Sequence, residues 1–164
     1  MADGSFDPSS KRTARFMECN GCEFHSELYY DSEYQIWLRR EHDDSLTVGM
    51  TDISQTIAGK ILHVRVRRPG TIREPGKPVA TIESGKWAGP IPNFIHCVIL
   101  EGNIEVLENP VLLNSDPYNA WIARVEASAG VDAALEAFLT GDEAHEGYCR
   151  RARDEDIHCQ RKVR

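Results

Sequence analysis

The middle of the chain alternates between apolar and polar side chains in short runs, as half-buried β-strands do. The run KILHVRV, residues 60–66, places Leu62, Val64 and Val66 on one face of an extended segment. Proline and glycine pairs, as in the run RRPGTIREPGKP, separate such strands and mark loops. Residues 34–126 are therefore predicted to form a series of short strands.

Two neighbouring runs predict a β-hairpin followed by a short helix. YQIWLRR and LTVGM are rich in β-branched and aromatic residues, and the polar run between them suits a tight turn. In the next run, TDISQTIAG, Asp52 and Gln55 fit a capping box that opens a helical turn. Gly59 is a suitable residue to end it.

Helical spacing occurs only near the C-terminus. In the run SAGVDAALEAFLTG, apolar residues recur at intervals that place them on one helical stripe: Val131, Leu135, Phe138 and Leu139. Gly141 suits the end of this helix. The following run, DEAHEGYCRRARDE, begins with acids and ends with arginines, as the helix dipole prefers, and predicts a second helix.

These patterns predict a domain organisation. The first residues are polar and show no regular periodicity, which predicts a flexible N-terminal segment over residues 1–27 that carries a Cys-x-x-Cys motif. A β domain is expected over residues 28–127, with a helical segment packed on it over 128–153 and a tail over 154–164.

The charge balance restricts the partners that the protein is expected to bind. The 164 residues include 19 basic and 26 acidic side chains, for a net charge of −7. An acidic chain is poorly suited to nucleic acid or an anionic membrane surface, so neither is expected as a partner. The chain lacks an apolar signal segment and the ~18 consecutive apolar residues of a membrane span, so a cytoplasmic location is expected.

The cysteines number five and are irregularly spaced: Cys19, Cys22, Cys97, Cys149 and Cys159. An odd count in a chain expected in a reducing compartment argues against a disulfide framework. They are interpreted as free thiols, or as redox or metal-binding groups, and Cys97 as a small core residue.

Cys19 and Cys22 belong to a Cys-x-x-Cys-x-x-His motif that ends at His25. The spacing could supply three zinc ligands, and the sequence offers four candidates for a fourth: His145, Cys149, His158 or Cys159. A redox-active or persulfide-handling dithiol and an inert thiol pair are the alternatives. Because the motif lacks a second paired half, Cys19 and Cys22 are taken as candidate redox thiols and no metal site is assigned.

The stretch TIESGKWAG contains the lysine of greatest interest. Two strand-like runs meet at Gly85 and Lys86, which places Lys86 at the tip of a predicted β-hairpin, and Gly85 can supply the positive φ that primed hairpin turns require. A lysine there projects into solvent from a rigid base, where a modifying enzyme can reach it. On this evidence alone, a solubilising surface lysine is the favoured interpretation, because most turn lysines have no special role.

Segments on both sides of this hairpin carry a resemblance to a known family. The runs TVGMTDISQTIAGKILHVRV, ATIESGKW and LENPVLLNSDPYNAWIARV resemble the glycine cleavage system H protein family in order and spacing, over about residues 28–150. One motif of the family is matched at six positions: Asn109, Pro110, Asn114, Asp116, Pro117 and Tyr118. The resemblance implies a mainly β fold, a flattened β-barrel or barrel-sandwich hybrid with C-terminal helices.

The resemblance also implies a cofactor. In the family, the lysine of the hairpin motif carries lipoic acid in amide linkage, and Glu83, Ser84, Gly85 and Lys86 match that motif. Lys86 is therefore expected to be the covalent lipoyl site, with Trp87 beside it able to cover the cofactor or meet a partner. Biotin carriers share the fold, but their lysine lies between methionines, so lipoate is favoured.

Several positions depart from the glycine cleavage proteins. Gln35 and Ile36 replace a histidine and a glutamate of the first strand, Trp87 replaces a small residue, and a Pro-x-x-Gly turn reads Pro92 to Ile95 without its glycine. The Cys-x-x-Cys motif is a further addition. These features are similar to the H-like lipoate-binding proteins that accompany heterodisulfide-reductase-like complexes in sulfur oxidation.

The expected function is therefore that of a carrier protein and not of an enzyme, since the motifs place no nucleophile–base pair. The arm on Lys86 is expected to carry sulfur or a sulfur-derived intermediate for a heterodisulfide-reductase-like complex. A lipoate-attaching ligase is an implied partner, and dihydrolipoamide dehydrogenase is a candidate one. The alternatives are a glycine cleavage H protein that carries an aminomethyl group, and a regulatory or metal-binding module without lipoate.

Overall fold

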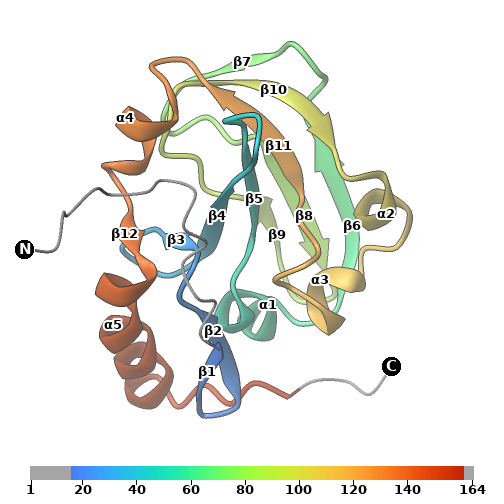
Figure 1. Cartoon of the computed structure of the whole chain (residues 1–164). Helices are drawn as coiled ribbons and strands as arrows, with labels where there is room; N and C mark the ends of the chain where they lie inside the picture. Colours follow the sequence, from blue (N-terminus) through green and yellow to red (C-terminus); the bar gives the residue numbers. More distant parts are fainter. Residues whose placement is uncertain (1–15, 161–164) are drawn as a thin grey trace, which may run out of the picture.

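A computed structural model describes residues 16–160, and it is mainly β (Figure 1). The largest sheet has seven antiparallel strands, in the order β12 (Leu139–Thr140), β3 (Tyr29–Tyr30), β4 (Ile36–Arg40), β5 (Leu46–Met50), β11 (Ala123–Ala127), β10 (Cys97–Gly102) and β7 (Ile72–Arg73). A second sheet has three strands, β6 (Ile61–Val66), β8 (Ala80–Ser84) and β9 (Ala88–Pro90). The mainly β architecture expected from the sequence is confirmed.

The two larger sheets enclose the main hydrophobic core. Side chains from both sheets belong to one buried cluster, among them Leu38, Val48 and Val125 from the larger sheet and Val64 and Ile82 from the smaller one. Neither sheet closes on itself, and their packing fits a barrel-sandwich hybrid. The strands that bear Lys86 are thus anchored in the core.

Strand β6 differs from the simple alternation that the sequence suggests. Leu62 was expected on the buried face with Val64 and Val66, but 42% of Leu62 is exposed, and Ile61 is buried in its place. The pairing of β6 with β8 shifts register between Ile61 and His63. This irregularity reverses the side-chain alternation and turns Leu62 outward.

Short helices connect the strands at one end of the β domain. They are α1 (Asp52–Ala58), α2 (Ile104–Glu108) and α3 (Leu112–Ser115). Helix α1 lies where the sequence predicts, but Thr51 and not Asp52 is its N-cap, with its hydroxyl accepting from the Ser54 N–H at 3.1 Å. The Asp52 side chain instead accepts a hydrogen bond from the Glu23 N–H.

The C-terminal helical region has different boundaries from those predicted. Helix α4 (Val131–Leu135) is short, β12 pairs with β3, and α5 (Gly141–Asp154) then begins with a capping box between Thr140 and Glu143. Gly141 starts a helix instead of ending one. A side chain at Gly141 would collide with the backbone of Ser26, so close packing against the N-terminal segment explains the glycine. The second predicted helix is confirmed.

The prediction of a flexible segment over residues 1–27 is wrong for its described part. Strands β1 (Phe16–Cys19) and β2 (Cys22–His25) form a hairpin that packs on α5, while residues 1–15 lie outside the described part of the chain. Phe24 is fully buried, and its ring centroid lies 4.8 Å from that of Tyr30 and 5.1 Å from that of Tyr148. Tyr148 belongs to α5, which is distant from Phe24 in the sequence, and this explains why local periodicity does not reveal the hairpin.

The predicted tail over residues 154–164 is also partly ordered. Ile157 and Cys159 are buried against the N-terminal hairpin, and the Cys159 N–H donates to the carbonyl of Asn20 at 3.1 Å. Residues 161–164 lie outside the described range. In the described part of the chain, no helix has the length and apolar character needed to cross a membrane.

A buried polar network attaches the N-terminal hairpin to the β domain. The Asp52 carboxylate accepts from the Glu23 N–H at 2.8 Å and from the Gln55 side-chain amide at 2.6 Å. The hydroxyls of Tyr118 and Tyr148 both donate to the Glu23 carbonyl, each at 2.6 Å. The two elements are thus joined by buried hydrogen bonds as well as by aromatic packing.

The buried position of Asp52 predicts a pH-dependent stability. The pKa of the Asp52 carboxyl is raised from 3.8 to about 6, mainly by burial. The charge of Glu18 also raises this pKa, while the Gln55 hydrogen bond and His25 lower it. A raised pKa stabilises the folded state at low pH, and this contribution is lost as pH rises through about 6.

Urea unfolding of wild type and Asp52→Asn at a series of pH values measures this contribution. Between about pH 4 and pH 6, the unfolding free energy of wild type should fall relative to that of the variant, by at most about 1.4 kcal/mol per pH unit. A constant difference between the two proteins across this range would contradict the prediction.

Candidate functional site

Lys86 lies at the tip of the β8–β9 hairpin, as the sequence predicts. Glu83 pairs with Ala88, and the Ser84 N–H donates to the Trp87 carbonyl at 2.7 Å, which leaves Gly85 and Lys86 as the two central turn residues. Lys86 is exposed, as are Glu83, Gly85 and Trp87, whereas Ser84 is buried. The hairpin therefore presents its lysine on a base that is rooted in the core.

The Ser84 side chain shapes the tip. Its hydroxyl oxygen accepts from the backbone N–H groups of Lys86, at 3.2 Å, and Trp87, at 3.0 Å. Gly85 does not have the positive φ that was expected of it, and a Cβ atom added there would meet nothing within 4 Å. That expectation was wrong because a side-chain hydrogen bond, and not glycine's backbone freedom, forms this turn.

Replacement of Ser84 by alanine should therefore loosen the tip, while Gly85→Ala should not. Loss of the hydroxyl leaves two turn N–H groups without their acceptor, at a cost of about 1–2 kcal/mol. Hydrogen exchange of the Lys86 and Trp87 amides, measured together with thermal unfolding, should show faster exchange in Ser84→Ala than in wild type. Equal protection in Ser84→Ala and Gly85→Ala would contradict this role of Ser84.

The Lys86 side chain lies alongside a pocket on one side of the hairpin. Its Cε atom is 3.5 Å from the position that a Cβ of Gly59 would take, and Gly59 ends α1 with a φ of 78°. The pocket, called the lysine pocket here, has a volume of about 600 Å³. Six of the residues that line it are Gln55, Gly59, Lys60, Asn114, His158 and Gln160.

Asn114 supports the wall of the lysine pocket. Its side-chain amide donates to the Gly59 carbonyl at 2.8 Å and to Gln55 at 3.0 Å, and its oxygen accepts from the Ile61 N–H at 2.9 Å. Asn114 thus joins the end of α1 to the start of β6 beside the lysine. Asn114 was identified in the sequence as part of the motif shared with the H protein family, but the sequence did not show this contact.

A groove of about 490 Å³ lies on the other side of the hairpin. It is called the tryptophan groove here, and its lining includes Gln35, Ile36, Ile57, Trp87, Pro92 and Arg151. Trp87 is 45% exposed, and its ring covers Gly89, where any added side chain would collide with the indole. Positions singled out separately in the sequence, Gln35, Ile36, Trp87 and Pro92, therefore meet in one place.

Four of the five cysteines contradict the interpretation as free thiols. Cys19 is bonded to Cys149 and Cys22 to Cys159, across sequence separations of 130 and 137 residues. Cys19 and Cys22 are therefore not a redox dithiol with each other in this structure. Such long-range pairs have no local signal in the sequence.

Cys97 is buried in the core, as the sequence predicts. Burial raises the pKa of its thiol to about 11, which keeps it protonated and unreactive at neutral pH.

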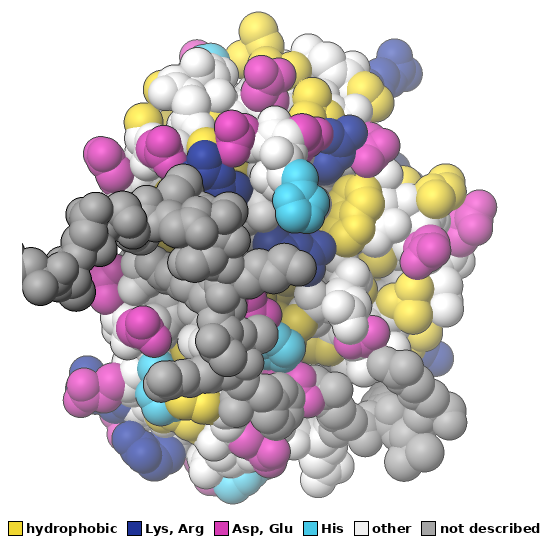
Figure 2. Space-filling model, viewed as in Figure 1, with side chains coloured by type: hydrophobic (Ala, Val, Ile, Leu, Met, Phe, Trp, Pro, Cys, Tyr) yellow, Lys and Arg dark blue, Asp and Glu magenta, His cyan; other side chains and the backbone are white. Residues whose placement is uncertain are grey.

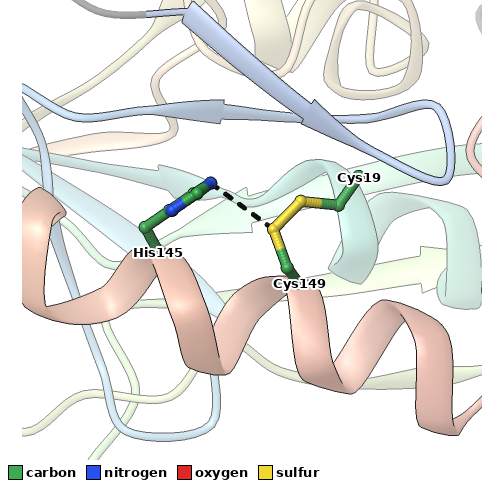
Figure 3. Close-up of side chains that lie close together, drawn as sticks. All are labelled: Cys19, His145 and Cys149. Atoms are coloured by element: carbon green, nitrogen blue, oxygen red, sulfur yellow. Dashed lines mark hydrogen bonds between the residues drawn. A yellow bond between two sulfur atoms is a disulfide. The ribbon is translucent and has the colours of Figure 1, made fainter.

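The residues considered as zinc ligands, and not assigned to a metal site, are only partly brought together. His25 stacks on Tyr118, with ring centroids 4.1 Å apart, and Cys22 is held in the Cys159 disulfide. Cys19, His145 and Cys149 do lie close to one another, on the face where α5 meets the N-terminal hairpin (Figure 3).

On the face shown in Figure 2, basic side chains are interspersed with acidic ones and form no large basic area.

The sequence pattern of the glycine cleavage H-protein family matches residues 28–150. The chain belongs to this family. It is 43% identical to "Glycine cleavage system H protein 3" of Aquifex aeolicus, over 89% of this chain and 92% of that protein. It is 40% identical to "Probable glycine cleavage system H protein 2" of Sulfolobus acidocaldarius, over 85% of this chain and 95% of that protein.

A solved structure shares the fold of this family member. The crystal structure of a glycine cleavage system H protein from Mycobacterium marinum matches with a TM-score of 0.62 and 21% identity, over 75% of this chain and 98% of that chain. Proteins of the family bind lipoate on a lysine and act as carriers instead of catalysts. They interact with glycine cleavage enzymes and with lipoate ligases.

The sequence did not identify several residues around the hairpin. His158 and Gln160 reach the lysine pocket because the Cys22–Cys159 disulfide holds the C-terminal segment there, and nothing local in the sequence points to this. Gln55 and Gly59 were interpreted only as helix-start and helix-end residues. Their position beside Lys86 depends on how α1 packs against the hairpin.

Proposed function

We propose that this protein is a lipoate-binding carrier in which Lys86 holds the lipoyl group. We further propose that the arm carries sulfur or a sulfur-derived intermediate in oxidation by a heterodisulfide-reductase-like complex. The observation that carries the second part is the tryptophan groove. Gln35, Ile36 and Trp87, where the sequence departs from glycine cleavage proteins, line this one surface beside Lys86, together with Pro92 at the start of the turn that lacks the family's glycine.

The residues at the hairpin tip fit a lipoyl group. Lys86 is exposed, Ser84 holds the backbone on either side of it, and open space lies on both sides of the hairpin. When bound, lipoate supplies a cyclic disulfide that a thiolate can open. The chain contributes position: Ser84 sets the direction of the arm, Asn114 supports the lysine pocket, and Trp87 offers an apolar wall that excludes water.

The tryptophan groove differs chemically from a site with a histidine and a glutamate. Ile36 is buried, and with Ile57, Trp87 and Pro92 it supplies mainly apolar surface, while Gln35 is uncharged. An aminomethyl group is an amine, which a carboxylate and an imidazole can hydrogen-bond. Sulfur is more polarisable and makes favourable contacts with aromatic rings, so the lining of the groove suits a sulfur-bearing arm better.

The partners follow from this proposal. A lipoate-attaching ligase would recognise the exposed hairpin around Lys86, and subunits of a heterodisulfide-reductase-like complex would meet the loaded arm. Dihydrolipoamide dehydrogenase is a candidate for reoxidation. A glycine cleavage role with an aminomethyl load and a regulatory role without lipoate are the alternatives.

Transfer assays with the lipoylated full-length protein separate the first two roles. Glycine decarboxylase is offered wild type, the Trp87→Ala variant and an authentic glycine cleavage H protein as control, and aminomethylation is followed by mass. Wild type should load at least tenfold more slowly than the control while it accepts sulfur in the presence of the heterodisulfide-reductase-like complex. Robust aminomethylation of wild type would overturn the sulfur assignment but leave the carrier role intact.

A further inference from the structure

Three potential metal ligands meet at the junction of the N-terminal hairpin and α5. One ligand atom each from Cys19, His145 and Cys149 lies within 4.8 Å of the other two. Figure 3 shows His145 and Cys149 one turn apart on the same side of α5, with Cys19 facing them from the end of β1. His145 Nε2 lies 3.5 Å from the Cys149 sulfur.

This arrangement does not depend on the Cys19–Cys149 bond alone. Asn20, in the hairpin turn, donates its side-chain amide to the Ala152 carbonyl on α5 at 3.1 Å. Gly21 has a φ of 77° and lies so close to the Cys159 carbonyl that a Cβ atom would collide with it. The turn next to Cys19 is thus docked on the C-terminal region by contacts that do not involve the Cys19–Cys149 bond.

The ring of His145 is also held in place. Its centroid lies 5.3 Å from that of Phe24, a fully buried residue of β2. A disulfide does not require an imidazole beside it, whereas a metal site needs a third ligand in this position. The spacing of four residues on one helix is the spacing at which two side chains face a common point.

We infer that Cys19, Cys149 and His145 bind one Zn²⁺ ion when the Cys19–Cys149 disulfide is reduced. Two thiolates and an imidazole form a ligand set that zinc prefers. Zinc bonds of about 2.0–2.3 Å in a tetrahedron place neighbouring ligand atoms roughly 3.3–3.8 Å apart. The 3.5 Å between His145 Nε2 and the Cys149 sulfur lies in this range, and the two bonded sulfurs would move apart when the disulfide opens. The fourth position falls to water or a small external ligand, and it can be reached because Cys19 and His145 are partly exposed.

The disulfide and the zinc ion exclude each other. An external dithiol reduces the Cys19–Cys149 bond with two electrons and two protons, which gives two thiols, and the dithiol itself becomes a disulfide. Zinc then displaces the two thiol protons and binds the thiolates. Either state ties β1 to α5, so zinc would preserve this link in a reducing environment.

Zinc titration of untagged, full-length protein tests the inference. The protein is reduced with a dithiol, and the reductant is then removed under anaerobic conditions. Zn²⁺ is added in the presence of a chromophoric chelator that competes with the protein for the ion. Reduced wild type should bind one equivalent, and oxidised wild type should bind none until it is reduced. Zinc affinity should fall at least tenfold in His145→Ala, while His25→Ala, which removes the histidine of the Cys-x-x-Cys-x-x-His motif, should bind like wild type.

A spectroscopic readout guards against variants that fail to fold. Co²⁺ in place of zinc should give tetrahedral and thiolate charge-transfer absorption bands in reduced wild type and in Lys86→Arg, but no thiolate bands from this site in Cys19→Ser. The far-ultraviolet circular dichroism of each variant reports its fold. No zinc binding by reduced wild type, equal binding by His145→Ala, or binding that depends on His25 would each overturn the inference. Binding in Lys86→Arg keeps this result separate from the carrier role.

Discussion

Lys86→Arg should abolish lipoylation completely. Arginine keeps the positive charge and the length of the side chain, but its guanidinium stays protonated and cannot form the amide bond. The fold should be unaffected, because Lys86 is exposed at the tip of the β8–β9 hairpin. Intact mass after co-expression with a lipoate ligase and lipoate should show one lipoyl adduct on wild type and none on the variant.

Lys60→Arg is a matched control for this experiment. Lys60 lines the same lysine pocket, but it follows α1 instead of occupying the hairpin tip. It should be lipoylated like wild type. An adduct that persists in Lys86→Arg would contradict Lys86 as the attachment site, and an unmodified wild type would favour the regulatory module without lipoate.

Removal of the Cys22–Cys159 disulfide should lower the free energy of unfolding more than the Ser84 or Asp52 substitutions do. The bond joins residues 137 apart, and closing so long a loop restricts the unfolded chain strongly, so its loss should cost about 2–5 kcal/mol. Urea unfolding of the oxidised Cys22→Ala/Cys159→Ala variant, in the presence of a zinc chelator, should show this decrease against oxidised wild type.

Two further comparisons separate this bond from its neighbour. A reductant should destabilise wild type further than it destabilises the double variant, in which only Cys19–Cys149 remains to be opened. The double variant should also become sensitive to protease near its C-terminus, because Cys159 anchors the segment that carries His158 and Gln160 to the lysine pocket. Identical unfolding of the oxidised wild type and the double variant would contradict a stabilising role.

Local signals were sufficient to predict most of the β domain. The hairpin over residues 34–50, strand β8 and the turn at Lys86 all follow from residue types and spacing that act over fewer than ten positions. Helix α5 was predicted for the same reason, from acids at its start and arginines at its end. The family resemblance then directed attention to the lysine at the hairpin tip.

Contacts between distant segments decided what the sequence could not. Residues 16–27 were expected to belong to a flexible segment, but Phe24 is buried against Tyr148 of helix α5. Gly141 was expected to end a helix, but its contact with Ser26 places it at the start of one. In both cases a partner far along the chain outweighed the local preference.

The amino-acid sequence by itself therefore determined the mainly β architecture, the exposed lysine and its place in a hairpin, because these depend on short-range propensity and side-chain alternation. Only the tertiary structure decided the pairing of the cysteines, the gathering of Gln35, Ile36, Trp87 and Pro92 in one groove, and the approach of His145 to Cys19 and Cys149. Those features depend on how separate elements pack against each other, and that geometry is not encoded in any single stretch of the chain.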